Sequence, residues 1–277
     1  MRIADDILQQ LTRALSGGPI PRVRALHLPP ALWTGTKDGE FGAIELDSGA
    51  LGLSYLLLGG TLAELARRPE AAQQALAGQD ALALARRWAD GDTPADRALG
   101  FAAVNALSRH LQDAAGLAPP DAPDSIGGLA PQAGEPIGMV GFFPPLVKQV
   151  TALGAQLTVL ELRADLAGNH PGYTVTLDPA ALRGCTQVLM TSTVLLNHTL
   201  DDVLAHCAGA RAIAMIGPGA GLLPDALFAR GVTAVGGSWI TDRDGFVAAL
   251  AQGAPWGASA RKFVWTPAAW PGLAATP

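Results

Sequence analysis

Residues 137–160 read IGMVGFFPPLVKQVTALGAQLTVL, and this stretch decides the fold of the C-terminal half. An apolar run at 137–140 is followed by Gly141 to Pro145, by a helical pattern over 146–153, and by a second apolar run at 156–160. Short apolar runs on either side of one helix are typical of two parallel strands joined by a crossover connection. The stretch therefore predicts a strand–helix–strand unit.

The same alternation continues toward the C-terminus. Further strands are predicted at 188–191, 212–216 and 232–235, and further helices near 199–207, 224–230 and 244–252. Five short apolar strands that alternate with helices indicate a parallel sheet covered on both faces. We therefore expect residues 137–277 to form a Rossmann-like domain.

The first 117 residues follow a different order. The pattern predicts a helix over 3–15, strands at 22–28, 41–46 and 51–56, and helices over 61–68, 80–88 and 93–116. Glu64 stands three residues after Thr61 and predicts a capping box at the start of its helix. A β-meander followed by helices is an α+β arrangement. Residues 118–136, APPDAPDSIGGLAPQAGEP, are rich in proline and glycine and are predicted to link the two domains.

Composition excludes several classes of protein. Of the 277 residues, 49% are hydrophobic and 16% charged, which excludes an intrinsically disordered chain. With 19 Lys and Arg against 24 Asp and Glu, no basic field exists to attract nucleic acid. The 2 cysteines fit a reducing compartment, and no run approaches the roughly 18 apolar residues of a membrane span. We expect a cytoplasmic protein that binds neither nucleic acid nor membrane.

In open α/β sheets, ligands bind beyond the carboxyl ends of the strands. The sequence places polar or glycine-rich residues at five such ends, and we expect these stretches to converge on one ligand-binding edge. The candidates are Gly141, Phe142, Phe143 and Pro144 after the first strand, Glu161 after the second, Thr191, Ser192 and Asn197 after the third, Gly217, Pro218 and Gly219 after the fourth, and Ser238 after the fifth.

Several of these candidates also have a plainer interpretation. Phe142 and Phe143 either stack on a flat ligand or belong to the core, and their bulk disfavours a dinucleotide-binding loop. Glu161, 20 residues after Gly141, either accepts a hydrogen bond from a ribose hydroxyl or is a solvated carboxylate paired with a nearby cation. Asn197 either contacts the ligand or caps the helix that follows it.

The remaining candidates concern anions, metals and the first domain. The loop 217–221, GPGAG, can turn amide N–H groups toward an anion, but it lacks the lysine of a P-loop. Asn105 shares a helix face with Arg97, and it either bonds to a neighbouring loop or borders the cleft between the domains. None of the five histidines pairs at the H-x-x-x-H spacing, so no resident metal site is predicted. The chain has no G-x-S-x-G motif and no locally supported Cys/His pair, so no covalent nucleophile is predicted either.

Seven segments resemble the bacterial and archaeal family of putative heavy-metal chelation proteins. They are Trp33–Thr36, Arg97–Ala106, Met139–Leu146, Leu160–Glu161, Thr191–Leu200, Ile216–Pro218 and Gly231–Gly237. The resemblance runs through nearly the whole chain in the expected order. It implies an N-terminal domain similar to the enolase N-terminal fold, a Rossmann-like C-terminal domain, and the handling of a metal or metal chelate. The chain departs from the family where Gly219-Ala220 replace the usual Ser-Thr pair.

Three functions remain compatible with the sequence. The first is a binding protein for a small metal chelate or its organic ligand. The sequence does not identify a cofactor, and a metal chelate brought by the ligand is the candidate. The second is an enzyme acting on a heterocyclic or nucleotide-like molecule, with Glu161 holding hydroxyls or acting as a base. The third is a non-catalytic homo-oligomer, in which residues 263–267 and Trp270 supply an apolar contact surface.

Overall fold

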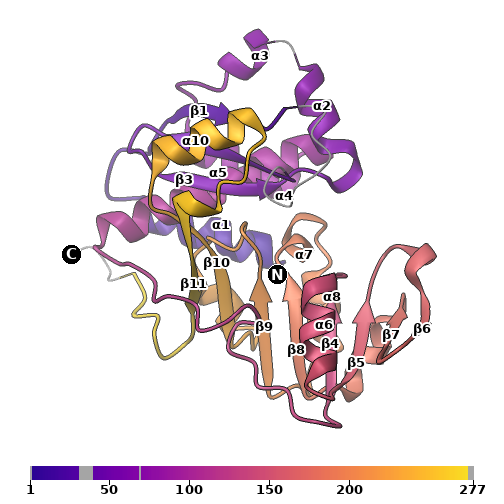
Figure 1. Ribbon diagram of the computed structural model, residues 1–277. Helices are drawn as coiled ribbons and strands as arrows, with labels where there is room; N and C mark the ends of the chain where they lie inside the picture. The colour runs from indigo at the N-terminus through magenta and orange to yellow at the C-terminus, as the bar shows by residue number, and fades with distance from the viewer. Residues whose placement is uncertain (1, 31–39, 69, 274–277) are drawn as a thin grey trace.

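The computed structural model describes residues 2–30, 40–68 and 70–273. Figure 1 shows a three-stranded sheet in the upper half of the molecule and an eight-stranded sheet in the lower half. The upper half is formed mainly by the N-terminal part of the chain and the lower half by the C-terminal part. The predicted mixed α/β fold is confirmed. The position of the domain boundary stays a prediction.

The N-terminal elements follow the predicted order. They are α1 (Ile3–Ala14), β1 (Val23–His27), β2 (Phe41–Leu46), β3 (Leu51–Tyr55), the 3-10 turn η2 (Leu58–Gly60), α2 (Thr61–Arg67), α3 (Glu70–Gln74), α4 (Ala81–Asp90) and α5 (Pro94–Ala114). The strands form the expected antiparallel meander, β1-β2-β3. Helix α5 begins where predicted, because the Thr93 hydroxyl accepts the N–H of Asp96 at 3.1 Å.

The predicted capping box at Thr61 is wrong. The N-cap residue of α2 is Gly60, which adopts φ 77 and makes no side-chain cap. The Thr61 hydroxyl instead donates to the carbonyl of Leu58 at 2.6 Å. Glu64 accepts hydrogen bonds from Arg68 and Thr93, so its carboxylate ties α2 to the start of α5.

Helix α5 lies directly on β3 because the strand has no side chain at the crossing point. A β-carbon on Gly52 would stand 2.0 Å from the backbone nitrogen of Ala106. The crossing of α4 and α5 is equally close, since a β-carbon on Gly100 would stand 2.1 Å from the nitrogen of Trp88. These distances require glycine at both positions.

The C-terminal elements form the predicted parallel sheet and extend it. They are β4 (Pro136–Val140), α6 (Pro144–Ala152), β5 (Gln156–Leu160), η3 (Ala164–Leu166), β6 (Gly168–His170), β7 (Tyr173–Thr176), η4 (Pro179–Gly184), β8 (Gln187–Thr191), α7 (Thr193–Leu196), α8 (Leu200–Ala205), β9 (Ala212–Ile216), α9 (Asp225–Phe228), β10 (Ala234–Ile240), α10 (Arg243–Gln252), η5 (Gly257–Ser259) and β11 (Ala260–Trp265). The five predicted strands are β4, β5, β8, β9 and β10, but β10 starts later and runs further than expected. Ser238 was predicted to follow this strand and instead lies within it, paired with Lys262 of β11.

The strand order is β11-β10-β9-β8-β4-β5-β7-β6. All neighbours from β10 to β7 pair in parallel, whereas the edge strands β11 and β6 run antiparallel. The chain leaves β4 toward β5 and later returns past β4 to β8. This reversal makes the crevice between β4 and β8 the topological switch point, where open α/β sheets bind ligands.

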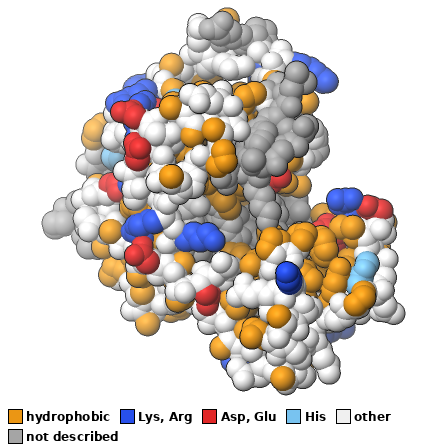
Figure 2. Space-filling view, in the orientation of Figure 1, with side chains coloured by type: hydrophobic (Ala, Val, Ile, Leu, Met, Phe, Trp, Pro, Cys, Tyr) orange, Lys and Arg blue, Asp and Glu red, His pale blue; other side chains and the backbone are white. Residues whose placement is uncertain are grey.

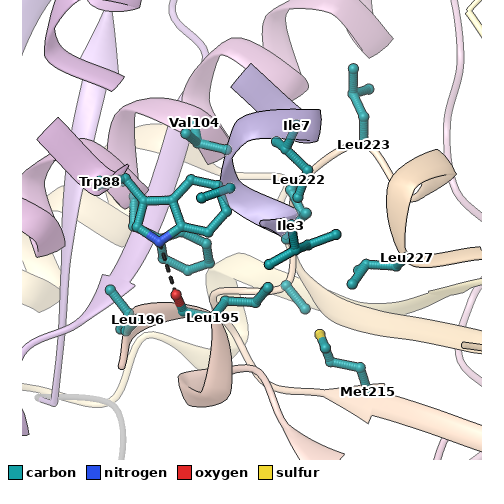
Figure 3. Packing of buried hydrophobic residues seen from close by; sticks show 14 of the residues in the cluster. Ile3, Ile7, Trp88, Val104, Leu195, Leu196, Met215, Leu222, Leu223 and Leu227 are labelled. Carbon is teal, nitrogen blue, oxygen red and sulfur yellow. Dashed lines mark hydrogen bonds between the residues drawn. The ribbon is translucent and has the colours of Figure 1, made fainter. Parts of the chain in front are cut away.

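The two halves share cores. Figure 3 shows Ile3 and Ile7 of α1 packed near Leu227 of α9 and Met215 of β9. Residues 118–135 are irregular, yet Ile126 within them is buried against the opposite face of the large sheet. The second face of the meander is covered by α10, a helix from the C-terminal half.

The predicted apolar contact surface near the C-terminus is wrong. Phe263, Val264 and Trp265 belong to β11, where their exposed fractions are 2%, 7% and 3%. Trp270 packs edge-on against the ring of Trp265, with centroids 5.0 Å apart. These side chains are thus used within the chain itself. None of the described helices combines the length and apolarity needed to cross a bilayer.

Candidate functional site

A pocket of about 230 Å³ lies between the two halves of the molecule. Its lining comes from the ends of β3, the starts of α2 and α5, and the loops after β5 and β8. The lining residues are Tyr55, Leu58, Thr61, Pro94, Arg97, Ala98, Leu162, Leu196 and Asn197. The loops after β5 and β8 flank the end of β4, so the pocket lies at the switch point of the sheet.

Hydrophobic side chains line one wall of this pocket, namely Leu58, Leu162 and Leu196. Figure 2 shows further hydrophobic side chains on the right-hand lobe, which corresponds to β5, β6 and β7 in Figure 1. Leu162, in the loop after β5, lines the pocket and is 68% exposed. Its exposed carbon surface, together with Leu58 and Leu196, gives the pocket an apolar wall, as small-molecule sites have.

Arg97 is the charged side chain of the pocket lining. It lies in the first turns of α5, and its Nη1 donates to the carbonyl of Gly91 at 2.9 Å. The neighbouring carboxylate of Asp96 is held by Arg68 at 3.1 Å. Within the described residues no carboxylate pairs with Arg97, so its charge acts on the pocket.

Asn197 reaches the pocket from the loop between α7 and α8. Its Oδ1 accepts hydrogen bonds from the N–H and the hydroxyl of Thr199, at 3.2 and 2.7 Å. Because a backbone N–H can only donate, these bonds fix which end of the amide is oxygen. The predicted cap is wrong, because the N-cap residue of α8 is Thr199 and no side chain caps that helix. The Oδ1 instead closes a turn onto Thr199, and Nδ2 has no acceptor among the described residues.

The loop that carries Asn197 is anchored to α4. Figure 3 shows Trp88 donating from Nε1 to the carbonyl of Leu195 at 2.9 Å. His198 stacks on the Trp88 ring and adopts φ 57, a left-handed conformation that is uncommon for residues other than glycine. Burial and the positive charge of Arg97 lower the pKa of His198. Its ring is therefore neutral at pH 7 and adds no second cation beside the pocket.

Tyr55 contributes a hydroxyl from the end of β3. Burial and the negative charges of Glu40 and Glu161 raise the pKa of Tyr55 to about 12. The phenol therefore keeps its proton at neutral pH and can donate a hydrogen bond. Thr61 cannot do the same, because its proton is already given to Leu58.

Glu161 holds two loops together at the edge of the sheet. Its Oε2 accepts the N–H of Phe142 at 2.9 Å, and its Oε1 accepts the N–H groups of Leu162 and Arg163 at 2.7 and 3.2 Å. The alternative of an ion pair with a nearby cation is wrong, because no described cation pairs with Glu161 and the Arg163 side chain binds Asp165 at 2.6 Å. The carboxylate thus fixes the loop that presents Leu162.

The other residues after β4 stand beside the pocket rather than in its lining. Phe142 and Phe143 are partly buried against the core under α6, and Phe142 packs on the ring of Tyr173 at 6.1 Å. Pro144 is the first residue of α6. Gly141 adopts φ 89, and a β-carbon there would stand 3.0 Å from Thr191.

The predicted residues after β8 pack into the sheet edge. The Thr191 hydroxyl lies 3.0 Å from that of Thr193, so both are engaged within the loop. Ser192 is buried. A β-carbon on Gly217 would stand 2.3 Å from the Ser192 hydroxyl oxygen, so these two loops touch.

Residues Pro218, Ser238 and Asn105 line a second, much smaller crevice of about 10 Å³. Asn105 donates from Nδ2 to the carbonyls of Leu53 and Gly219 at 2.7 and 2.8 Å. Its Oδ1 is buried and has no partner among the described residues. Asn105 therefore both bonds to a loop backbone and borders the junction between the two halves.

The structure thus brings Asn197 to the larger pocket, with Glu161 shaping its wall, and places Pro218, Ser238 and Asn105 around the crevice. Sequence reasoning missed Tyr55, Thr61 and Leu58, which come from the other half of the chain. The sequence marks them only by position: Tyr55 ends β3, and Leu58 and Thr61 begin the two helical turns that follow it. Trp33–Thr36, part of the family resemblance, lie outside the described residues.

Metal ligands do not cluster in the part of the chain that the structure describes. No group of three or more His, Cys, Asp or Glu side chains there is placed to hold an ion. Cys185 and Cys207 are buried free thiols. Burial raises the pKa of Cys207 to about 11, with a smaller contribution from Cys185, so both thiols stay protonated at neutral pH.

Two family models described as putative heavy-metal chelation match residues 40–108 and 128–266. A protein of unknown function from Pyrococcus horikoshii is similar in structure, with a TM-score of 0.66 and 19% identity over 95% of this chain and 99% of that one. Another, from Desulfitobacterium hafniense, has a TM-score of 0.67 and 18% identity over 95% and 98%. At such identities the likeness shows the fold alone. No curated protein matches the chain.

Proposed function

Because the chain belongs to the family of putative heavy-metal chelation proteins, we propose that it binds a heavy metal as its complex with a small organic ligand, or that ligand itself. The binding site in this proposal is the pocket between the two halves. The observation that carries it is the lining, which combines an apolar wall with a few polar groups from both halves. Small-molecule sites are built in this way.

The chemistry of the lining favours a complexed metal over a bare ion. Leu58, Leu162 and Leu196 offer carbon surface, which suits the skeleton of an organic ligand. Arg97 carries a positive charge, which repels a bare cation but attracts a chelate with net negative charge. Asn197 and Tyr55 supply hydrogen bonds that can fix the orientation of the ligand.

The sequence-predicted residues take two roles in this proposal. Asn197 contacts the ligand, whereas Glu161 holds the loop of Leu162 in place. Those around the smaller crevice fix how the two halves meet, through the bonds from Asn105 to Leu53 and Gly219. The composition of the chain supports a cytoplasmic location for this activity.

Titration calorimetry and thermal unfolding with three probes test the proposal: Ni²⁺ alone, nitrilotriacetate alone, and their 1:1 complex. We expect the complex or the free chelator to bind and to raise the unfolding temperature. A ligand at 100 times its Kd adds about 2.7 kcal/mol to the free energy of unfolding. Bare Ni²⁺ should bind weakly.

Two matched variants locate the binding. Leu162→Trp fills the pocket mouth and should abolish the response. Leu177→Trp changes another exposed leucine, with 48% exposure and no place in the pocket lining, and should leave the response intact. Tight stoichiometric binding of bare Ni²⁺, or an undiminished response of Leu162→Trp, would contradict the proposal.

A further inference from the structure

We propose that the pocket recognises an oxyanion on its ligand, a carboxylate in the first place, attached to an apolar body. This inference rests on the proposed function and deepens it by naming the chemical class of the ligand. It is carried by three hydrogen-bond donors, from Arg97, Asn197 and Tyr55, that line one cavity without a carboxylate among the described lining residues.

Arg97 supplies the positive charge of the pocket. Its guanidinium has five N–H donors, and one nitrogen, Nη1, is engaged by Gly91. The remaining donors keep the planar fork that matches a carboxylate or a phosphate. Apolar neighbours such as Ala98 and Leu196 lower the local polarity, which strengthens the attraction of this charge for an anion.

The side-chain amide of Asn197 supplies the second donor. Its oxygen is occupied twice by Thr199, so only the Nδ2 hydrogens are available to a ligand. An asparagine can in general donate and accept. Here the hydrogen bonds within the loop remove the accepting half, and the side chain presents donors alone.

The hydroxyl of Tyr55 supplies the third donor. It stands at the end of β3, in the half of the molecule opposite to Asn197. Since its pKa is raised, it remains a donor across the physiological range. The hydroxyl of Thr61 can only accept because its proton bonds to Leu58. Three donors therefore face one acceptor, and an acceptor-rich group on the ligand satisfies them best.

Three probes separate this inference from the proposed function. Hexanoate carries a carboxylate on an apolar chain, hexanamide is its neutral match, and inorganic phosphate is an oxyanion without an apolar body. Binding is followed by titration calorimetry and by ligand-observed NMR. We expect hexanoate to bind at least about tenfold more tightly than hexanamide.

Variants assign the preference to Arg97. Arg97→Gln should remove the preference for hexanoate while hexanamide still binds, and Arg97→Lys should retain part of it. The matched control is Arg163→Gln, which removes an exposed arginine one residue beyond Leu162 that pairs with Asp165. It should leave the preference unchanged. Circular dichroism confirms that each variant is folded.

The outcomes are distinct. Binding of phosphate without binding of hexanoate would support recognition of an oxyanion but would overturn the assignment to a carboxylate. Equal binding of hexanoate and hexanamide, unaffected by Arg97→Gln, would overturn the inference and leave the proposed function standing. If neither organic probe, phosphate nor the nickel chelate binds, the proposed function fails as well.

Discussion

Replacing Asn105 by alanine should weaken the junction of the two halves. Asn105 is 2% exposed and donates to the carbonyls of Leu53 and Gly219. Its removal leaves two buried carbonyls without their donor, at about 1–3 kcal/mol each, while the loss of the unpartnered Oδ1 offsets part of that cost. We expect the free energy of unfolding to fall by about 2–4 kcal/mol.

Urea unfolding followed by tryptophan fluorescence measures this change. Asn105→Asp has nearly the same shape but sets a carboxylate against the two carbonyls, so it should be at least as destabilising as alanine. Ser108→Ala, one turn away on α5, removes hydrogen bonds to Val104 and Leu223 and should cost less. A loss below about 0.5 kcal/mol in Asn105→Ala, which is typical of surface substitutions, would refute the reasoning.

Two further predictions concern carboxylates. Glu161→Gln replaces one accepting oxygen by a donor, so at least one of the amides of Phe142 and Leu162 should exchange hydrogen faster, whereas the surface control Asp165→Asn should change neither. Unchanged exchange of both amides in Glu161→Gln would contradict the role of Glu161 in holding the two loops together. Burial opposes ionisation of Glu45, but hydrogen bonds from Arg243 and His27 lower its pKa below the usual 4.5. Its contribution to stability is therefore present above about pH 4.5 and lost as the pH falls through the folded-state pKa. Urea unfolding at several pH values should show a shallower acid loss in Glu45→Gln, and an identical slope would count against this role.

The parallel strands could be predicted because their burial on both faces makes them continuous apolar runs. Strands β6 and β7, at one end of the sheet, lack that signal. Residues 168–170 of β6 are Gly, Asn and His, and β7 carries two threonines among its four residues. Strand β11 was misread because its apolar residues follow a helix near the end of the chain, and periodicity does not reveal whether such a run pairs with β10 or faces a partner.

The residues of the candidate site differ in the same way: some follow from the strand pattern, and others depend on how the two halves pack. Asn197 could be predicted because it follows a parallel strand, and the chain's topology alone brings such ends together. Tyr55 could not be assigned to the pocket, since it enters it through the packing of the meander on the other half. For Arg97 the sequence left open whether its helix face borders the cleft, because that depends on how α5 packs. The expectation for Asn105 succeeded in part for an energetic reason, because a buried amide must bond somewhere.

The pocket walls are held as one body by contacts that cross between the halves. Trp88 bonds to Leu195 on one side of the pocket, and Asn105 bonds to Gly219 near the smaller crevice. Helix α10 covers the meander although the chain reaches it only after β10. Opening the pocket by a hinge would break these buried bonds and contacts, each costly to lose. The two sides of the pocket are therefore fixed relative to each other, so the walls lose little conformational freedom when the proposed ligand binds.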